Sequence, residues 1–517
     1  MGAGRRKAQR WRCAAAALVA TLTVAPTTPA VYATGSAAAE TRRPNFVLFL
    51  VDDLDALTSP YWDALPKTRA LIADRGVAFD KAYAPTPICC PARATTLTGE
   101  YGHNTGVLTN AGPHGGWPAF NAGGGEERTF PLALHDAGYR TMLVGKYLNE
   151  VDPTHVPPGW DEYYGGANDR IEGGYNYALN ENGTLVWHGA KPEDYEADVV
   201  ANHTVDFVTR AAADPGTPFL AYVAPTAPHM PQPPAPRYRD HPWRYADPPA
   251  NPNFFEADVS DKPWWLRVSA TARSAWRAWN KVDYENRMGS LLAVDDLVAN
   301  TVAALDAAGT LDDTYLIFAS DNGYNLGAHR LVHKMAPYEE SLRVPFVMAG
   351  PGVVHATDDH PVLLTDIAPT VLELAGMTVP DHVDGRSIVP LLHGEASPPW
   401  RDAFPIQYAS AGLTAGLGDT WPPFAYLVVL ILLVGADVPS YRGVHTQRYA
   451  YIEWYDRELF GLHEYELYDL EADPWQLDNL LATPAGRAAN AAVTADLAAR
   501  LAVLSTCHGS GCRDAGG

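Results

Sequence analysis

Basic residues are in short supply in this 517-residue sequence, where 38 Lys and Arg stand against 60 Asp and Glu, a formal net charge of −22 at pH 7. Binding to nucleic acid depends on neutralising phosphates with Lys and Arg, so this balance argues against a nucleic-acid partner. A polyanionic polymer would also be repelled unless basic residues gather at one site. Otherwise the composition is that of a globular protein, unlike disordered, collagen-like or coiled-coil sequences.

Long hydrophobic runs are also missing, because no apolar run reaches the roughly 20 residues that a membrane-spanning helix requires. The run over 13–25 follows five basic residues and precedes small residues at 31–33. This pattern predicts a secretory signal peptide over residues 1–33, with a membrane anchor as the alternative. We therefore expect a secreted, extracellular protein without stable membrane insertion. A second run, 424–434, is predicted to be a buried strand or a divergent segment.

Cysteine is scarce, with five in the whole sequence. Cys13 lies in the predicted signal peptide. Cys507 and Cys512 flank a short Gly-containing loop, which favours a disulfide in an oxidising compartment. Cys89 and Cys90 are adjacent, and neighbouring cysteines rarely pair because the bond would strain the backbone. A role other than a disulfide must therefore explain the presence of Cys89 and Cys90.

What the sequence does contain is an alternation of strand and helix patterns. The continuous apolar run 45–51 is typical of a strand buried on both faces, and similar runs occur at 218–223, 314–320 and 344–349. Segments in which apolar residues recur at helical spacing, for example 289–308, lie between these predicted strands. The sequence therefore predicts an α/β fold with a large, mostly parallel central sheet flanked by helices. The alternation weakens after about Leu392, which predicts a larger domain over 43–392 and a smaller α+β domain over 393–517.

Polar side chains follow two of the predicted strands directly. Asp52 and Asp53 come after the first strand, and Asp321 and Asn322 follow the strand 314–320. Open α/β sheets bind ligands beyond the carboxyl ends of their strands. Four oxygen-bearing side chains there would suit one Ca²⁺ or Mg²⁺ ion. The alternative is that these residues only cap turns or helices, which is their commonest use.

A longer motif is more specific. Residues 89–93 read Cys-Cys-Pro-Ala-Arg, and residues 97–99 read Leu-Thr-Gly. This stretch resembles the signature of type I, formylglycine-dependent sulfatases. Further blocks resemble that family in the same order along the chain, at 45–53, 145–146, 227–229, 320–323, 334, 338–345 and 466–474. The sequence is most similar to the N-acetylglucosamine-6-sulfatase and bacterial arylsulfatase branch, and the resemblance implies an alkaline-phosphatase-like fold.

The resemblance implies hydrolysis of sulfate esters, on sulfated sugars such as N-acetylglucosamine-6-sulfate or on another sulfated small molecule or glycan. Cys89 would be oxidised by a formylglycine-generating enzyme, and the hydrated aldehyde would attack sulfur beside a divalent cation. Arg93 would orient the hydrate, Lys146 and Lys334 would hold the sulfate, and His229 would protonate the leaving oxygen. The implied metal ligands are Asp52, Asp53, Cys89, Asp321 and Asn322.

One departure from the family concerns the position two residues after Lys146. Many sulfatases have a histidine there, whereas this sequence has Leu148. The base that triggers release of sulfate is therefore unassigned, and His103 is a candidate only because it is near the motif in sequence.

Two other functions remain open. A phosphonate or phosphate monoester hydrolase could use the same machinery, and a catalytically silent protein could bind sulfated glycans. Tryptophans at 243, 264, 265, 276 and 279 could form an aromatic wall for a sugar, although core packing is their more usual role.

Overall fold

The computed structural model describes residues 43–57, 60–167, 169–269, 273–395, 400–410, 438–455 and 463–516. The predicted signal peptide and the run 424–434 lie outside the described residues.

A ten-stranded mixed sheet forms the centre of the fold. In spatial order the strands are β13 (Ala356–Asp358), β2 (Val77–Phe79), β12 (Phe346–Ala349), β9 (Thr314–Ser320), β1 (Asn45–Val51), β8 (Phe219–Ala224), β4 (Arg140–Gly145), β5 (Glu162–Gly166), β6 (Tyr177–Glu181) and β7 (Thr184–His188). The strands β9, β1, β8, β4 and β5 run parallel in the middle of the sheet, and antiparallel pairs occur toward both margins. The predicted α/β class and mostly parallel sheet are confirmed.

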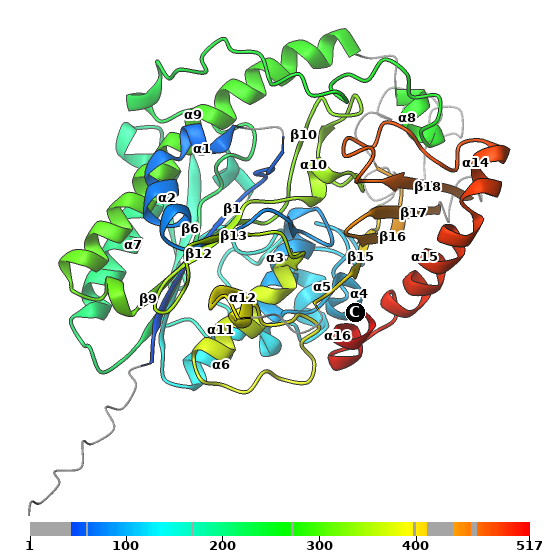
Figure 1. Cartoon of the computed structure of the whole chain (residues 1–517). Helices are drawn as coiled ribbons and strands as arrows, with labels where there is room; N and C mark the ends of the chain where they lie inside the picture. Colours follow the sequence, from blue (N-terminus) through cyan, green and yellow to red (C-terminus); the bar gives the residue numbers. More distant parts are fainter. Residues whose placement is uncertain are drawn as a thin grey trace, which may run out of the picture. The chain divides into compact units, whose positions relative to one another are not determined.

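Helices cover both faces of this sheet, as Figure 1 shows. One face carries α1 (Tyr61–Ala64), α2 (Pro66–Leu71), α7 (Glu196–Ala212) and α9 (Arg273–Ala307). The other carries α3 (Cys89–Thr98), α6 (Phe130–Asp136), α11 (Ile367–Leu374) and α12 (Val389–Leu392). The other described α-helices are α4 (Gly102–Thr105), α5 (Gly116–Ala122), α8 (Trp264–Ser269), α10 (Glu339–Leu342), α14 (Pro484–Ala489), α15 (Ala491–Leu504) and α16 (Ser510–Ala515).

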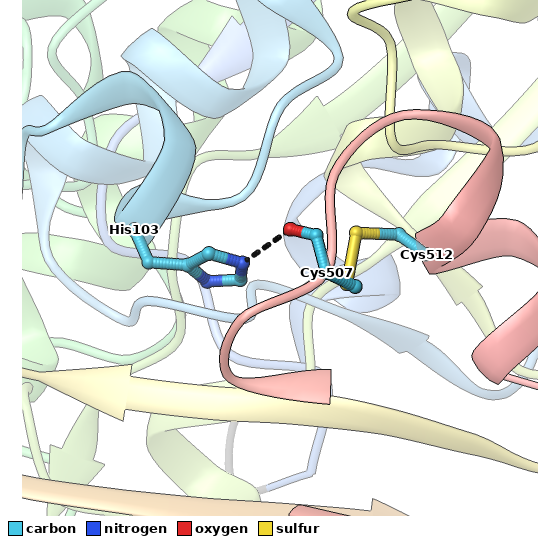
Figure 2. A group of neighbouring side chains, drawn as sticks. All are labelled: His103, Cys507 and Cys512. Carbon is cyan, nitrogen blue, oxygen red and sulfur yellow. Dashed lines mark hydrogen bonds between the residues drawn. A yellow bond between two sulfur atoms is a disulfide. The ribbon is translucent and has the colours of Figure 1, made fainter. Parts of the chain in front are cut away.

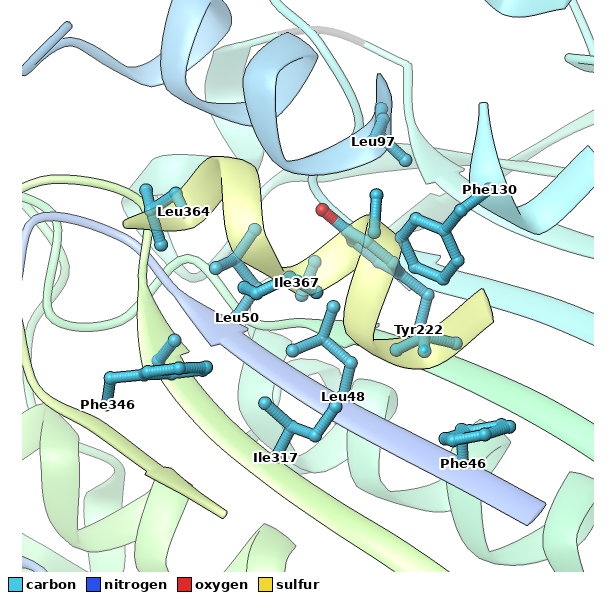
Figure 3. Close-up of a cluster of buried hydrophobic side chains, with 14 of the residues drawn as sticks. Phe46, Leu48, Leu50, Leu97, Phe130, Tyr222, Ile317, Phe346, Leu364 and Ile367 are labelled. Carbon is cyan, nitrogen blue, oxygen red and sulfur yellow. The ribbon is translucent and has the colours of Figure 1, made fainter. Parts of the chain in front are cut away.

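The apolar residues of β1 contribute to the hydrophobic clusters on both faces of the sheet, because successive residues of a strand point to opposite faces. Val47, Phe49 and Val51 pack with α7 and α9. The alternate residues, among them Phe46 and Leu48, pack with α3, α6 and α11 (Figure 3). Burial on both sides explains why this strand is apolar throughout.

A separate antiparallel sheet follows in the carboxy-terminal part. Its strands are β15 (Ala403–Tyr408), β16 (Tyr441–Thr446), β17 (Tyr449–Tyr455) and β18 (His463–Asp469), in that order, and α15 packs against them. Two short pairs complete the described strands, β10 (Asn325–Leu326) with β11 (Val332–His333) and β3 (Ala82–Tyr83) with β14 (Val362–Leu363). Residues of the antiparallel sheet share a hydrophobic cluster with Tyr101 and Tyr338 of the larger part. The boundary near residue 392 stays a prediction.

Two elements differ in detail from the sequence expectation. The strand within 344–349 is β12, which runs antiparallel to β9 because the chain returns through β10, β11 and the four-residue α10 without a long crossover helix. Helix α9 begins at Arg273, well before the predicted start near Gly289. Gly289 lies inside the helix, where a Cβ would come within 2.5 Å of Pro234 Cγ, so this glycine permits close packing and does not end the helix.

Helix α9 also contains a segment, Trp279–Ala307, that is apolar and long enough to cross a membrane by composition alone. Most of it is buried in the core beside α7, as is usual for a helix that packs inside a protein.

Candidate active site

Four neighbouring parallel strands end at one edge of the sheet, and each delivers predicted site residues. Asp52 and Asp53 follow β1, Asp321 and Asn322 follow β9, Lys146 follows β4, and the loop after β8 carries His229. The register pairs Val51 with Ser320, so the Asp52–Asp53 and Asp321–Asn322 pairs leave the sheet side by side. Residues far apart in sequence therefore converge because parallel strands end together.

The Asp52–Asp53 and Asp321–Asn322 pairs contact each other directly. The backbone turns at Asp53, with φ of 68°, a left-handed conformation that Asp adopts more readily than most residues. The Asp53 N–H donates to Asp321 Oδ1 at 3.1 Å, and Asn322 Nδ2 donates to Asp53 Oδ1 at 2.7 Å. All four side chains are buried.

Cys89 is the first residue of α3, whose N-terminal end points into this cluster of carboxylates. Its Sγ lies 3.5 Å from Asp52 Oδ1 and 2.7 Å from Lys334 Nζ. Cys89 and Cys90 are both buried and unpaired, as the sequence predicts. Pro91 sits in the first turn, where a missing N–H costs nothing and a helix N-terminus favours negative charge.

Three buried cations balance the carboxylates. Arg93 Nε donates to Asp321 Oδ2 at 2.8 Å, and its Nη1 donates to the Lys146 carbonyl at 2.9 Å. Lys146 Nζ lies 2.6 Å from Asp52 Oδ2, and Lys334 Nζ contacts Asp53 Oδ1. The site thus combines positive charge for an anion with oxygen ligands for a cation.

His229 stands at the less buried side of the cluster. Its Nε2 lies 3.5 Å from Asp53 Oδ2, and its Nδ1 contacts the Met230 carbonyl oxygen. A carbonyl oxygen only accepts, so Nδ1 carries a hydrogen and Nε2 is the nitrogen that faces the site.

Burial and the neighbouring charges shift the pKa values of the site residues. Burial alone would raise the pKa of Asp52, but Lys146 and other nearby cations outweigh it and lower that pKa well below its ordinary value. Burial and the charge of Asp52 raise the pKa of Asp321 to about 6. Burial also raises the pKa of the Cys89 thiol, so an unmodified Cys89 is uncharged at neutral pH and a poor nucleophile.

The donor set suits a hard divalent cation. Ligand atoms of Asp52, Asp53, Cys89 and His229 all lie within 4.8 Å of one another. Asn322 Oδ1 is buried without a hydrogen-bond partner among the described residues, which is costly unless something occupies that position. Carboxylate and amide oxygens are the ligands that Ca²⁺ and Mg²⁺ prefer, so the residues fit such an ion.

Comparison with known proteins decides the family. The family profile described as Sulfatase matches residues 44–377. This chain belongs to the sulfatase family. The sulfatase is 33% identical to human N-acetylglucosamine-6-sulfatase over 510 residues, covering 93% of this chain and 87% of the relative. It is 36% identical over 392 residues to the Drosophila melanogaster protein named extracellular sulfatase SULF-1 homolog, but covers 74% of this chain and only 34% of that longer relative.

The fold of this sulfatase also matches solved structures. A protein solved in complex with its substrate D-glucosamine-2-N,6-O-disulfate superposes with a TM-score of 0.70 at 24% identity, covering 89% of this chain and 97% of that one. The alkaline-phosphatase-like architecture predicted from the sequence is thereby confirmed.

His103 is not part of the cluster in this sulfatase, so it is the wrong residue for the missing base. It lies on α4, and its Nε2 contacts the Cys507 carbonyl oxygen at 3.1 Å, beside the Cys507–Cys512 disulfide (Figure 2). The ten residues of α3 separate it from Cys89, a rise of about 15 Å. The disulfide itself is confirmed.

Three of the five tryptophans considered for an aromatic wall pack in the hydrophobic clusters of the sulfatase. Trp265 is buried against Trp454, with ring centroids 5.3 Å apart, and Trp243 and Trp264 pack against the hydrophobic clusters. Trp279 lies 5.1 Å from the His333 ring, next to Lys334 in sequence. The side chain of Trp276 lies outside the described residues.

Two site residues were missed by sequence reasoning. Glu172 accepts a hydrogen bond from Lys146 Nζ at 2.8 Å and lies 3.6 Å from His229 Nδ1. Arg287, in the middle of α9, donates to the Pro228 carbonyl at 3.2 Å and to the Asp53 carbonyl. Neither lies in a motif, and only the fold brings them to the site.

Proposed function

We propose that this sulfatase hydrolyses sulfate esters of sugars, such as N-acetylglucosamine-6-sulfate, with formylglycine derived from Cys89 as the nucleophile. The observation that carries the proposal is the position of Cys89 Sγ, which lies between the Asp52 carboxylate and the Lys334 ammonium at the N-terminus of α3. Formylglycine, in its hydrated form, supplies an oxygen nucleophile at this position.

Asp52, Asp53, Asp321 and Asn322, with residue 89, would hold one Ca²⁺ or Mg²⁺ ion. The unpartnered Asn322 Oδ1 and the carboxylates already placed around Cys89 support this assignment. A bound divalent cation supplies positive charge that favours ionisation of a neighbouring nucleophile.

The chain's own cations bind and orient the substrate. Burial would lower the pKa of Lys146 and of Lys334, yet the carboxylates beside them raise both pKa values, so both ammonium groups keep their charge. Fixed charges in a buried site stabilise a sulfate group as its negative charge shifts to the leaving oxygen. Arg93 is held by Asp321 and by the Lys146 carbonyl, which fixes its orientation next to residue 89.

His229 donates the proton to the leaving oxygen. Because Nδ1 is engaged by the Met230 carbonyl, donation from Nε2 requires the doubly protonated ring. The carboxylates of Asp53 and Glu172, at 3.5 and 3.6 Å, balance the charge of that ring.

Two measurements test the proposal. Mass spectrometry of the peptide carrying Cys89, from protein made in its host, should show one sulfur and two hydrogens exchanged for one oxygen. Cys89→Ser should abolish release of sulfate, whereas Cys90→Ser, at the adjacent buried position, should keep it. An unmodified thiol in folded, active protein would overturn the assignment.

The two other functions are distinguished by the substrate. Faster turnover of an aryl phosphonate than of an aryl sulfate would favour a phosphonate monoester hydrolase. Binding of sulfated glycan without release of sulfate, in protein with a modified Cys89, would favour the silent binder.

Export of the protein is part of the same proposal. Formylglycine formation needs a generating enzyme as a maturation partner, and a secreted enzyme would meet sulfated glycans outside the cell. The extracellular relative from Drosophila melanogaster supports this location.

A further inference from the structure

A cavity that shares no residue with the cluster around Cys89 lies between α8 and the carboxy-terminal sheet. Its volume is about 360 Å³, within the range of about 300–1,000 Å³ that is usual for ligand pockets. Its walls come from α8, from the start of β18 and from α14, three elements that lie close together in Figure 1. The cavity is therefore separate from the active site.

The acidic groups that line the cavity are already paired with cations. Lys262 Nζ lies 3.1 Å from Asp261 Oδ2, and it also donates to two backbone carbonyls. Arg267 Nη2 lies 3.1 Å from Glu464 Oε1, and Glu464 Oε2 accepts a backbone N–H at 2.6 Å. Each of the two acids is thus balanced by a cation of the same cavity.

Arg487, on α14, is the lining cation that has no acidic partner. Its side chain is exposed, and its Nη1 donates to the carbonyls of Leu481 and Ala482 at 2.8 and 3.4 Å. Among the described residues no carboxylate forms an ion pair with it. The two carbonyls hold the guanidinium in place without neutralising it. The cavity therefore presents a positive charge in a chain whose formal net charge is −22.

An exposed aromatic ring lines the same cavity. Tyr465, on β18, is 46% exposed, and its ring stacks on that of Tyr451 with centroids 6.4 Å apart, which restrains its orientation. A tyrosine ring offers an apolar face with a polar tip, to which the C–H face and the hydroxyl groups of a sugar are complementary. A guanidinium pairs with sulfate or carboxylate through parallel hydrogen bonds. Together these two groups suit a sugar that carries an anionic group.

We propose that this cavity is an accessory binding site for an acidic sugar unit of a glycan chain, held by the Arg487 guanidinium and the Tyr465 ring. Binding there is independent of the reaction at Cys89, whereas its effect on turnover rests on the proposed function. A long glycan held at this cavity keeps its other sugar units near the protein, which raises their effective concentration at the active site. We therefore expect the site to favour chains over single sugars.

Calorimetric titration tests the site directly. The probes are a heparin hexasaccharide, in which uronate and sulfated glucosamine alternate, and an uncharged chitin hexasaccharide. The protein is Cys89→Ser with N-acetylglucosamine-6-sulfate at saturation, so that the active site is occupied and no turnover occurs. We expect the heparin probe to bind at least about fivefold more tightly than the uncharged probe, as one exposed ion pair implies.

Variants assign the binding to the two residues. Arg487→Gln should weaken binding of the heparin probe about fivefold, because it removes the unpaired charge. Tyr465→Ala should also weaken it and leaves the carbonyl contacts of Arg487 in place. Arg75→Gln, an exposed arginine before β2 that does not line the cavity, is the matched control and should bind as the parent does. Equal binding of the two probes, or an unchanged affinity in either folded cavity variant, would overturn the inference.

A third probe identifies the anionic group. A desulfated heparin hexasaccharide keeps its carboxylates and has lost its sulfates. If its binding still depends on Arg487, the site recognises carboxylate. If that dependence is lost, the site recognises sulfate.

Turnover separates this inference from the proposed function. Arg487→Gln should raise KM for a long heparin chain about fivefold at unchanged kcat and leave both constants for N-acetylglucosamine-6-sulfate unchanged. An unchanged KM for the chain, or an equal rise for the single sugar, would overturn the accessory site. If the wild-type enzyme releases no sulfate from either substrate while the heparin probe binds as expected, the reaction assignment fails and the accessory site stands.

Discussion

Glu196 is a buried carboxyl group in the first turn of α7, next to the loop that carries His229. It accepts a hydrogen bond from the Thr226 N–H at 3.1 Å, and Gln232 Nε2 lies 3.4 Å away. Burial raises the pKa of Glu196 from 4.5 to about 8. The side chain therefore holds a proton in the folded protein at pH values where the unfolded chain has released it.

Because the pKa of Glu196 is raised in the folded protein, we expect the protein to lose stability as the pH rises. Between about pH 4.5 and 8 the folded state binds more protons than the unfolded state, so the free energy of unfolding falls across that window, by an amount on the order of a few kcal/mol. Glu196→Gln should flatten this dependence, and the exposed Glu193→Gln should not. Urea unfolding at several pH values measures the free energy of unfolding as a function of pH. If this dependence is the same in wild type and in Glu196→Gln, the prediction is contradicted.

At the scale of elements, helix α9 supports the strands that carry the acidic pairs. Leu291, Leu297 and Val298 are fully buried in the cluster that includes Val47, Phe49 and Val51 of β1. The long helix thus packs directly behind the strand that ends at Asp52.

Shortening the Leu297 side chain should lower the free energy of unfolding. Leu297→Ala is expected to lower the free energy of unfolding by about 2–5 kcal/mol, because it leaves a cavity in a close-packed core. Val282→Ala, on the same helix but 56% exposed, should change it by about 0.5 kcal/mol or less. Denaturant titration of both variants makes the comparison, and equal effects would mean that α9 does not support the sheet in this way.

A second element, the carboxy-terminal turn, is tied to the segment after α3. Asp384 accepts hydrogen bonds from the Tyr101 N–H at 2.7 Å and from the Gly509 N–H at 2.6 Å. Asn104 Nδ2 donates to the carbonyl oxygen of Cys507 at 2.9 Å, so the disulfide-closed loop is held against α4.

Opening this loop should destabilise the fold modestly. The disulfide joins residues five positions apart, and closing so short a loop is worth about 2 kcal/mol. The double variant Cys507→Ser/Cys512→Ser should lose about that much stability, and treating the wild-type protein with a reductant should reproduce the loss. An unchanged free energy of unfolding would show that the hydrogen bonds of Asp384 hold the turn without the disulfide.

At the scale of the whole molecule, negative charge is in excess, yet cations are concentrated at one edge of the sheet. Lys146, Lys334 and Arg93 meet there because several strands and α3 end at the same place. An acidic protein can in this way bind a small anion at one site. The same edge gathers the carboxylates that suit a divalent cation.

Binding of that cation should stabilise the entire fold. An ion that binds only the folded state adds about 2.7 kcal/mol at a concentration one hundred times its Kd. The Tm should therefore rise with added Ca²⁺ or Mg²⁺ and fall in a chelator, and Asn322→Ala should weaken the response. Asn121→Ala, an exposed asparagine outside the site, is the matched control. A Tm independent of the metal concentration would contradict the assigned ligand set.

The sequence by itself determined the α/β class, the strands β1 and β9, the cluster of motif residues and the family. These follow from local patterns, since each motif residue lies next to the strand or helix that positions it. The tertiary structure alone decided that His103 belongs with the disulfide and that Glu172 joins Lys146 to His229. It alone placed the Arg287 guanidinium against the Asp53 carbonyl oxygen. These relations depend on side chains from segments far apart in the chain, whose approach is set by how the strands and helices pack and leaves no local pattern.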